Sequence, residues 1–407
     1  MAQDLLVSLS ADDHVVVVGA GLAGWTFCEE LRRREYRGAL TLVGEEEHEP
    51  YDRPPLSKQV AEGKWELERT SLVTPERRAA TEVTWRLAER AVELNVSGPF
   101  VELNSGERLH ATRVVVATGV RARQLPWRTP ETMTLRRRDD AERLSRALHS
   151  LRPSDEVVIV GAGFIGAELA TALVRRGLRV RVLEAAPIPL AAQLGPDLAR
   201  AIAAKASTAG VDLRTGVEIV GISSEGGYSD VLLSDGSEYH ARLVVAGVGA
   251  EPALEWIAGS GLATAQGILV NEHFEARARV GALGDVARFP WRGEPTRLEH
   301  WQIAHDSART LAAWWVNGEA LAPLVPYFWS DQYGQKVQVL GRPHPEARVH
   351  VVRGGLDEDR FVGLYERGGL VSAVVGLNQP RALMLSRPLL VEETSMEEAF
   401  RLAPWEG

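Results

Sequence analysis

Runs of β-branched apolar residues alternate along the chain with stretches whose apolar residues recur on one side of a helix. The first run, HVVVV at 14–18, is followed by a glycine-rich turn and by WTFCEELRRREY at 25–36. A second run, ALTLVG, follows at 39–44. Strands that alternate with amphipathic helices are typical of a parallel sheet covered by helices. The pattern therefore predicts an α/β fold.

The same pattern occurs a second time. EVVIV at 156–160 precedes another glycine-rich turn, a predicted helix at 167–177 and the predicted strand RVRVLE at 179–184. Both copies continue into a hairpin-like segment that ends in a strand and a glycine turn, at 100–119 and at 229–249. The first of these hairpins contains Asn-Ser-Gly, a typical turn sequence. The chain thus contains two related α/β units.

From about residue 323 the pattern changes to hairpin-rich segments such as KVQVLGRP and RFVGLYERGGLVSAVVGL. Short alternating strands joined by glycine turns predict an antiparallel sheet. We therefore expect a separate C-terminal α+β domain. The length of 407 residues is compatible with two or three domains.

Composition narrows the possible functions. With 45% hydrophobic and 25% charged residues the chain resembles soluble globular proteins. Its apolar runs are shorter than the ~20 residues that span a bilayer, and the N-terminal MAQDLLVSLSADD lacks the basic region of a signal peptide. The single cysteine, Cys28, cannot form an intrachain disulfide, which favours a reducing, cytoplasmic setting. The net charge of −9 argues against general nucleic-acid binding.

The first glycine turn fits the pattern G-x-G-x-x-G with Gly19, Gly21 and Gly24. In such a turn the first glycine permits the tight bend, the second lets a pyrophosphate approach the backbone, and the third lets the helix pack closely on the strand. The diphosphate lies at the helix N-terminus, where backbone N–H groups and the helix dipole favour negative charge. Glu45, at the end of the second strand, is placed to bind a ribose diol.

The second turn repeats this arrangement with Gly161, Gly163, Gly166 and the acid Glu184. One such turn could be purely structural, but two copies in the same context indicate that one chain binds two dinucleotides. A resident flavin and a visiting nicotinamide are the sensible pair, because flavin chemistry needs a source of hydride. Glu184 would repel a 2′-phosphate and so favours NADH over NADPH, although Arg179 and Arg181 lie nearby and could soften that preference.

Further motifs resemble a known family. VVVATG at 114–119, VVAGVG at 244–249 and GALGD at 281–285 resemble those of two-dinucleotide-binding flavoprotein oxidoreductases. YDRPPLSK at 51–58 and FWSDQY at 328–333, together with LEHWQIA at 298–304, are narrower. They are similar to the NADH-dependent ferredoxin reductases of oxygenase systems, of the putidaredoxin reductase and biphenyl dioxygenase reductase type. The resemblance extends over essentially the whole chain.

This resemblance implies two Rossmann-like domains of glutathione-reductase type followed by the C-terminal domain. It implies a discontinuous FAD-binding domain at 1–119 and 245–322, an NADH-binding domain at 120–244 and a C-terminal domain at 323–407. The cofactor-binding positions that it implies are Gly19, Gly21, Leu22, Ala23, Gly24, Glu45, Arg53, Pro54, Lys58, Ala91, Ala117, Thr118, Gly119, Arg136, Gly161, Gly163, Phe164, Ile165, Gly166, Glu168, Glu184, Gly247, Val248, Gly249, Gly284, Asp285, Glu299, His300, Trp301 and Trp329.

Several of these positions carry an implied role. Asp285 would bind the ribityl chain of FAD, and the backbone at Ala91 would contact its adenine end. Arg136 matches an arginine near the FAD phosphates, with Arg137 as a possible substitute. Trp301 and Trp329 resemble aromatic residues around the flavin, and the alternative for both is a tryptophan of the core.

Lys58 and Glu168 are the implied catalytic residues. Lys58 resembles a lysine beside the reactive edge of the isoalloxazine, and Glu168 would pair with it and help to hold the nicotinamide. The alternatives are a surface lysine and an ordinary acid near a helix N-terminus. His300 and His305 do not have the HExxH spacing, so we interpret them as helical histidines and expect no metal site.

The implied reaction is hydride transfer from NADH to FAD, followed by two one-electron transfers to a 2Fe-2S ferredoxin. Ferredoxins of this kind are usually acidic, so Arg288, Arg292 and Arg297 are predicted to line a docking face. The chain lacks the cysteine pairs of disulfide reductases, so electrons should leave the flavin directly. Alternatives are a rubredoxin reductase, an NADH oxidase, a redox sensor like apoptosis-inducing factor, or an inactive FAD-binding scaffold. AAPIPLAAQLG, after Glu184, lacks an arginine common in relatives.

Overall fold

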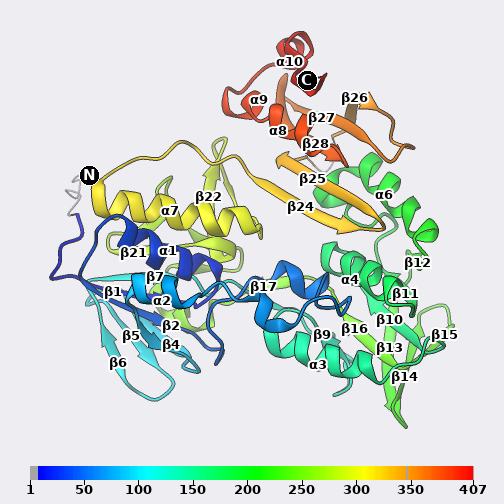
Figure 1. Ribbon diagram of the computed structural model, residues 1–407, viewed down its shortest axis with the longest axis horizontal. Coiled ribbons are helices and arrows are strands. Elements are labelled where there is room, and N and C mark those ends of the chain that lie inside the picture. Colours follow the sequence, from blue (N-terminus) through cyan, green and yellow to red (C-terminus); the bar gives the residue numbers. More distant parts are fainter. Residues whose placement is uncertain (1–7, 345–346, 407) are drawn as a thin grey trace. The chain divides into compact units, whose positions relative to one another are not determined.

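The computed structural model describes residues 8–344 and 347–406, and the chain forms two compact units (Figure 1). Each unit is built from three separate segments of the sequence. Unit 1 consists of Met1–Asp52, Thr70–Arg121 and Glu251–Leu324. Unit 2 consists of Arg53–Arg69, Ala122–Ala250 and Val325–Gly407. The division into three domains with the boundaries given above stays a prediction.

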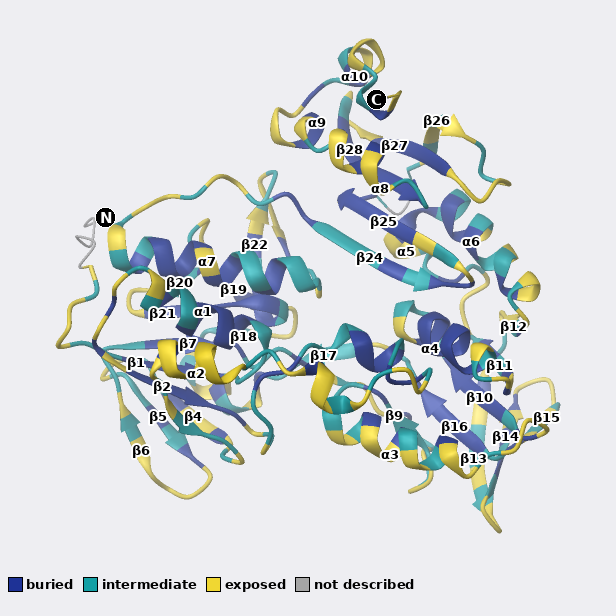
Figure 2. Cartoon of the chain, in the orientation of Figure 1, coloured by how far each residue is buried: buried dark blue, intermediate teal, exposed yellow. Residues whose placement is uncertain are grey.

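Unit 1 is centred on a six-stranded sheet with the order β20-β21-β7-β1-β2-β3. Strand β1 (His14–Val18) is parallel to β2 and β7, and Val15, Val16 and Val17 are fully buried (Figure 2). An unbroken valine run is expected for a parallel strand that is covered on both faces. Helices α1 and α7 pack against each other through the edge-on contact of Phe27 with Trp315, whose ring centres are 5.7 Å apart.

The other strands of this sheet are β2 (Ala39–Val43), β3 (Thr84–Arg86), β7 (Arg113–Val116), β20 (Glu275–Arg277) and β21 (Val280–Ala282). A three-stranded antiparallel sheet contains β4 (Ala91–Asn95), β5 (Phe100–Leu103) and β6 (Arg108–His110). A four-stranded sheet contains β18 (Ala263–Thr264), β19 (Gly267–Leu269), β22 (Ala287–Trp291) and β23 (Glu294–Thr296). The helices are α1 (Leu22–Arg33), α2 (Pro75–Thr81) and α7 (Trp301–Asn317), with the 3₁₀ turns η3 (Glu255–Ser260) and η4 (Gly284–Val286).

Unit 2 repeats the parallel arrangement in a five-stranded sheet with the order β12-β11-β10-β16-β9. These strands are β9 (Met133–Thr134), β10 (Glu156–Val160), β11 (Arg179–Glu184), β12 (Val211–Thr215) and β16 (Leu243–Ala246). A three-stranded antiparallel sheet contains β13 (Ile219–Glu225), β14 (Tyr228–Leu233) and β15 (Glu238–Ala241). The helices of this part are α3 (Arg138–His149), α4 (Phe164–Arg175), α5 (Ala191–Leu194) and α6 (Pro196–Thr208).

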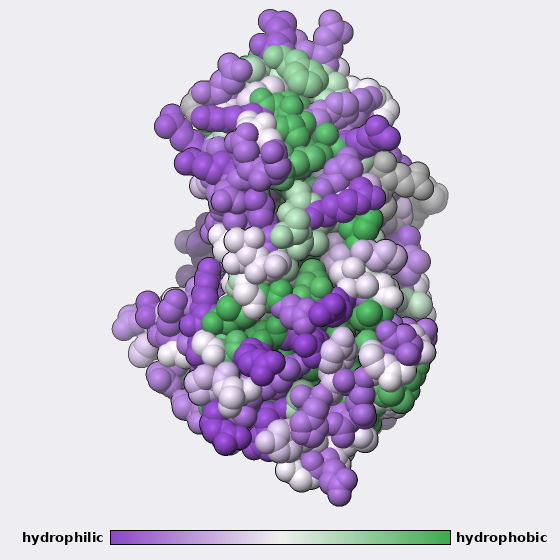
Figure 3. All heavy atoms as spheres, turned by 90° about the vertical axis from the view of Figure 1, so that its right-hand side faces the viewer, coloured by the Kyte–Doolittle hydropathy of each residue, from purple (hydrophilic) through white to green (hydrophobic). Residues whose placement is uncertain are grey.

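The last segment of unit 2 forms a five-stranded antiparallel sheet with the order β24-β25-β28-β27-β26. Its strands are β24 (Tyr327–Gln332), β25 (Gln335–Gly341), β26 (Val349–Gly354), β27 (Phe361–Arg367) and β28 (Leu370–Leu377). Three short helices follow: α8 (Pro380–Leu385), α9 (Pro388–Val391) and α10 (Met396–Leu402). Hydrophilic side chains cover much of the face seen in Figure 3, with apolar patches between them.

The predicted strands agree with those observed, whereas the two helices that follow the glycine turns begin earlier than expected. Helix α1 begins at Leu22 rather than Trp25, and α4 begins at Phe164 rather than Ala167. The last residues of each glycine motif therefore form the first helical turn. The closing strands β7 and β16 belong to the parallel sheets rather than to the hairpins that precede them. Among the described residues, no helix combines the length and apolar character needed to cross a bilayer.

Candidate functional site

The three glycines of the first turn differ in what surrounds them. Gly19 has a φ of +121°, and a Cβ there would lie 2.1 Å from the carbonyl oxygen of Ala117. A Cβ on Gly24 would lie 2.0 Å from the carbonyl oxygen of Gly19. Around Gly21, in contrast, no atom lies within 4 Å of the Cβ position. The fold itself thus requires the outer glycines, while the central glycine leaves a space beside the backbone that fits a pyrophosphate.

The second turn, in unit 2, has the same division. Gly161 has a φ of +99°, and a Cβ there would lie 2.5 Å from the carbonyl oxygen of Gly247. A Cβ on Gly166 would lie 2.0 Å from the carbonyl oxygen of Gly161. The nearest atom to a Cβ on Gly163 is 4.0 Å away, at Gly247. Both turns therefore fit a dinucleotide, and in both the open position is the central glycine.

Each turn leads directly into a helix whose first N–H groups point away from the helix. Gly21 is the N-cap of α1 and Gly163 is the N-cap of α4, and no side-chain hydrogen bond caps either end among the described residues. The first turns contain no acidic residue either. The backbone amides that begin at Leu22 and Phe164 can therefore receive a diphosphate without displacing an acidic cap.

The predicted site residues of unit 1 gather at the carboxyl edge of its parallel sheet. Gly19 follows β1, Ala117–Gly119 follow β7, and Gly284 and Asp285 follow β21, which is parallel to β7. A Cβ on Gly284 would lie 3.2 Å from the Cβ of Ala23 in α1. Ligands of open α/β sheets bind at this edge, so the fold brings these residues together. Thr118 donates a hydrogen bond to the carbonyl of Ala253 at 2.8 Å, which fixes the segment after β7.

Unit 2 has the equivalent edge. Gly247, Val248 and Gly249 follow β16, which is parallel to β10 and thus ends beside the second glycine turn. The amide of Gly247 donates to the carbonyl oxygen of Val160 at 2.7 Å. Ile165, in the first turn of α4, is 44% exposed, which is unusual for an isoleucine and leaves an apolar surface beside the turn.

The two acids that end the second strands lie in different surroundings. Glu45 is exposed after β2. Glu184 is half-buried, and its carboxylate accepts hydrogen bonds from the amide of Ala162 at 2.6 Å and from that of Ala186 at 2.8 Å. The first of these amides belongs to the glycine turn itself. Contact of either acid with a ribose stays a prediction.

The arginines that could soften a preference for NADH are engaged with carboxylates. Arg181 forms ion pairs with Glu156 at 2.5 Å and with Asp212 at 2.8 Å, and its guanidinium lies 4.0 Å from the ring centre of Tyr239. Arg179 lies 3.6 Å from Glu156. Arg181 would have to give up these interactions to reach a phosphate, whereas the Arg179 side chain is 66% exposed.

Lys58 and Glu168 form the predicted ion pair within unit 2, with 2.6 Å between Nζ and Oε2. The Lys58 side chain is 13% exposed and that of Glu168 is 4% exposed. Lys58 follows the 3₁₀ turn η1 (Pro54–Ser57), and Glu168 lies in α4. The pair is thus held between two segments that lie far apart in the sequence, and its catalytic role stays a prediction.

Two serines that the sequence did not single out also bind Glu168. The hydroxyl of Ser57 donates to Oε2 at 2.7 Å, and the hydroxyl of Ser330, in β24, donates to Oε1 at 2.7 Å. Both serines lie inside the motifs YDRPPLSK and FWSDQY. A hydroxyl inside a family-specific motif was the available signal, but the sequence does not reveal which acid it binds.

The arginines near these motifs make hydrogen bonds in which backbone groups take part. Arg53 donates from Nη1 to the carbonyl oxygen of Arg136 at 3.3 Å. The amides of Arg136 and Arg137 both donate to the carboxylate of Asp140 at 2.9 Å, at the start of α3. This arrangement fixes the backbone beside Arg53 and Pro54. Contact of these arginines with a phosphate stays a prediction.

The aromatic residues of the predicted site are half-buried rather than core tryptophans. Trp301 donates from Nε1 to Asp52 at 2.8 Å and stacks on His305 with ring centres 5.5 Å apart. Trp329 stacks on Tyr327 at 6.0 Å. Phe164, in the first turn of α4, meets Phe328 of β24 edge-on at 5.0 Å. Their contact with a flavin or nicotinamide ring stays a prediction.

The segment before α7 departs from expectation at one position. His300 was expected inside a helix, but it is the N-cap of α7, and only His305 lies within the helix. Burial lowers the pKa of His300 from 6.5 to about 4, so it is neutral at pH 7. Glu299 is exposed and pairs with Arg297 at 2.8 Å. Ala91 is buried at the start of β4.

The predicted docking arginines lie around one hairpin of unit 1. Arg288 is in β22, Arg292 is in the turn after it, and Arg297 follows β23. Arg288 donates to the carbonyl of Pro295 at 3.3 Å, and Arg292 lies 5.4 Å from the ring centre of Trp291. Because Arg297 pairs with Glu299, its charge is partly compensated.

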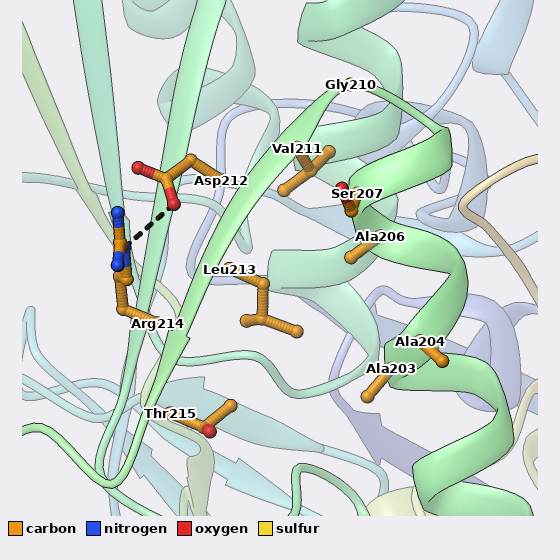
Figure 4. A pocket seen from close by; sticks show the side chains of 10 residues that line it. All are labelled: Ala203, Ala204, Ala206, Ser207, Gly210, Val211, Asp212, Leu213, Arg214 and Thr215. Atoms are coloured by element: carbon orange, nitrogen blue, oxygen red, sulfur yellow. Dashed lines mark ion pairs between the residues drawn. The ribbon is translucent and has the colours of Figure 1, made fainter.

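A hollow elsewhere in unit 2 is not the candidate site. It lies between α6 and β12 (Figure 4), where alanine side chains of the helix face Leu213 and Thr215 of the strand. Its charged residues, Asp212 and Arg214, are paired with each other at 2.8 Å. The hollow contains none of the predicted site residues, and small apolar side chains offer little to orient a ligand.

Comparison with known proteins supports the motif-based predictions. Residues 13–308 match the family model described as pyridine nucleotide-disulphide oxidoreductase, and residues 327–404 match the one described as reductase C-terminal. Rhodocoxin reductase of Rhodococcus erythropolis is 33% identical over 93% of this chain and 90% of its own length. The ferredoxin reductase component of chlorobenzene dioxygenase from Cupriavidus sp. (strain PS12) is 33% identical over 96% of this chain and 95% of its own.

Solved structures agree with this result. The reductase chain in the crystal structure of a covalent putidaredoxin reductase–putidaredoxin complex has a TM-score of 0.89 and 32% identity, covering 94% of both chains. The predicted fold class, two Rossmann-like parts followed by an antiparallel C-terminal part, is confirmed.

Proposed function

Because the chain belongs to the pyridine nucleotide-disulphide oxidoreductase family, we propose that it is an FAD-dependent enzyme that oxidises NADH and reduces a 2Fe-2S ferredoxin. The observation that carries this proposal is the pair of glycine turns, one in each unit. Within each turn's motif, the central glycine, Gly21 or Gly163, is the one with open space beside its Cβ position. If each turn binds one dinucleotide, one chain binds two cofactors. FAD in unit 1 and NADH in unit 2 match the order of the motifs.

The chain's own residues bind and orient rather than react. The amides that begin at Leu22 and Phe164 bind the diphosphates, and Glu184 accepts hydrogen bonds from a ribose diol in place of the amide of Ala162. The ammonium of Lys58, held by Glu168, keeps one positive charge at a fixed place. When bound, the flavin converts the two-electron chemistry of a nicotinamide into single-electron steps, which no side chain of the protein can do.

The electron acceptor belongs to the same proposal. The similar chlorobenzene dioxygenase component is named a ferredoxin reductase, and the similar putidaredoxin reductase was crystallised with putidaredoxin. An acidic 2Fe-2S ferredoxin suits the hairpin with Arg288 and Arg292, since opposite charges steer association. A cytoplasmic setting also belongs to the proposal, because a chain whose single cysteine is the buried Cys28 has no disulfide to maintain.

Spectroscopy of the purified protein tests the cofactors. We expect the visible absorption bands of bound flavin, and we expect anaerobic NADH to bleach them faster than NADPH does. A colourless protein that also fails to bind added FAD would refute the proposal. Anaerobic turnover with a panel of ferredoxins and rubredoxins, with oxygen as a separate acceptor, then separates a ferredoxin reductase from a rubredoxin reductase or an NADH oxidase.

The docking face has its own test. Replacing Arg288 and Arg292 together by Gln should slow ferredoxin reduction at low salt, with the difference vanishing towards 1 M salt, where the Debye length falls from about 30 Å at 0.01 M to about 3 Å. The control is Arg108→Gln, an exposed arginine of β6 that pairs with Glu102. Equal slowing by the control would show that general charge, rather than this hairpin, steers the ferredoxin.

A further inference from the structure

We propose that Ser57 and Ser330 are positioning residues that fix the carboxylate of Glu168 and, through it, the ammonium of Lys58. This inference rests on the proposed function, in which the ammonium of Lys58, held by Glu168, keeps one positive charge at a fixed place. Its basis is a set of hydrogen bonds to both carboxylate oxygens of Glu168, all within unit 2. Oε2 of Glu168 accepts from Lys58 at 2.6 Å and from Ser57 at 2.7 Å, and Oε1 accepts from Ser330 at 2.7 Å.

The geometry makes the serine hydroxyls donors. An ionised carboxylate accepts hydrogen bonds only, so each hydroxyl that faces Glu168 must turn its proton towards it. Ser57 also lies 3.4 Å from the carbonyl oxygen of Pro54, but the shorter contact to Glu168 takes the proton. Hydrogen bonds to a charged acceptor are stronger than those between neutral groups. The two serines therefore hold both oxygens of one carboxylate.

Burial makes these hydrogen bonds costly to break. Ser57 is 1% exposed, Ser330 is 0% exposed and Glu168 is 4% exposed. When the partner of so deeply buried a hydroxyl or carboxylate is removed, the folded state is destabilised, because no water molecule takes the partner's place. Loss of the Ser330 hydroxyl would leave Oε1 without its donor and allow the carboxylate to turn. Lys58, which is bound to the other oxygen, would move with it.

The strand that carries Ser330 is held against α4 at two further points. The amide of Tyr333 donates to Oγ1 of Thr171 at 2.7 Å, one turn beyond Glu168 on the helix. Phe328, two residues before Ser330, meets Phe164 of α4 edge-on. Ser330 is thus flanked by one contact within β24 and one just after it, as a residue must be if it is to position another. The C-terminal sheet thereby contributes a side chain to the Lys58–Glu168 pair.

Chemical labelling of lysines tests the positioning without turnover. In the purified flavoprotein we expect Ser330→Ala to raise the rate at which an amine-specific acylating reagent modifies Lys58 severalfold, since release of the carboxylate exposes the ammonium. Lys64, whose side chain is 64% exposed, is the internal reference, read by mass spectrometry from the same sample. Ser330→Thr keeps a hydroxyl and should restore most of the protection.

A matched control comes from the same sheet. Ser372, in β28, is 6% exposed, and its hydroxyl has no hydrogen-bond partner among the described residues. Ser372→Ala should therefore leave the labelling of Lys58 unchanged. If it raises the labelling as much as Ser330→Ala, loosening of the sheet explains both effects and the proposal is overturned. An unchanged rate in both Ser330→Ala and Ser57→Ala would overturn it as well.

Rapid kinetics adds a second readout. The rate constant for flavin reduction by NADH should fall about tenfold in Ser330→Ala, the effect of losing one hydrogen bond to a charged group, while the NADH dissociation constant changes little. In a Glu168→Gln background the same serine substitution should have little further effect, because the serine acts through the carboxylate. A full tenfold loss in that background would contradict the positioning role. If NADH does not reduce the flavin of the unaltered protein, the proposed function fails, and the labelling experiment still decides the positioning role.

Discussion

The two glycine turns pack in the same way, but the acids that end their second strands lie in different surroundings. In both turns the third glycine lies against the carbonyl oxygen of the first, and a Cβ there would approach to 2.0 Å. In both, the central glycine faces open space. In unit 2 the carboxylate of Glu184 binds back to its turn through the amide of Ala162, whereas in unit 1 Glu45 is exposed.

The carboxylate of Glu184 keeps one amide of its own turn hydrogen-bonded. A coenzyme that leaves after each turnover exposes the amides of its site again and again, and Glu184 supplies an acceptor for one of them when the ribose is absent. The following substitutions test how far the two turns act alike, from the largest expected effect to the smallest.

The largest effects are expected at the packing glycines. Gly24→Ala and Gly166→Ala should each destabilise the protein by about 3 kcal/mol or more, because the added methyl group meets a backbone carbonyl that cannot turn away. Urea unfolding measures this. Gly98→Ala and Gly221→Ala are matched controls, since nothing lies within 4 Å of either Cβ position. Similar midpoints for all four variants would contradict the packing argument.

The central glycines should separate binding from folding. Gly21→Ala should lose FAD during purification, and Gly163→Ala should weaken NADH binding at least about tenfold, or ~1.4 kcal/mol. Both glycines have negative φ values, so alanine costs the folded backbone little. Flavin content and NADH titration are the measurements, and unfolding midpoints close to the wild-type value are expected. Undiminished binding in both variants would mean that the dinucleotides do not use these turns.

The acids should differ in what they select. Glu184→Arg should raise the preference for NADPH relative to NADH about tenfold, because the substitution removes a carboxylate that repels a 2′-phosphate and adds a cation that attracts it. Glu45→Arg should leave that ratio unchanged. The ratio of kcat/KM for the two coenzymes measures the effect. If both substitutions shift it equally, the assignment of NADH to the second turn is wrong.

The smallest effect is expected at Arg181. Arg181→Gln removes two ion pairs, with Glu156 and Asp212, and should lower the free energy of unfolding by no more than about 2 kcal/mol. The preference for NADH should not change, because this arginine is already engaged. A clear shift in the coenzyme ratio would show that Arg181 is exchanged between its carboxylates and the ligand.

The sheets could be predicted from the sequence because an unbroken run of valines is typical of a parallel strand that is buried on both faces. The predicted family is confirmed by matches that extend over nearly the whole chain. The helix starts were missed by three residues, since a glycine pattern does not show that its own last residues are already helical. His300 was missed for a related reason: the start of α7 carries no side-chain cap to reveal it.

The site was predictable only in part. The Lys58–Glu168 pair followed from a resemblance in two motifs, and the ion pair is present. Ser57 and Ser330 were missed because they lie 111 and 162 positions from Glu168, and no local pattern indicates which distant acid a hydroxyl will meet. The assignment of Arg53–Arg69 to unit 2 was not predicted either, because it depends on contacts with segments that lie far away in the sequence.

The interleaving of the segments has a consequence for synthesis on the ribosome. The stretch that carries Lys58 emerges early, the helix with Glu168 follows much later, and the strand with Ser330 belongs to the last segment of unit 2. The buried carboxylate of Glu168 therefore lacks its Ser330 donor until β24 has been made. A nascent chain that stalls before β24 would hold an incompletely satisfied carboxylate, so we expect unit 2 to become resistant to protease only once β24 has been made.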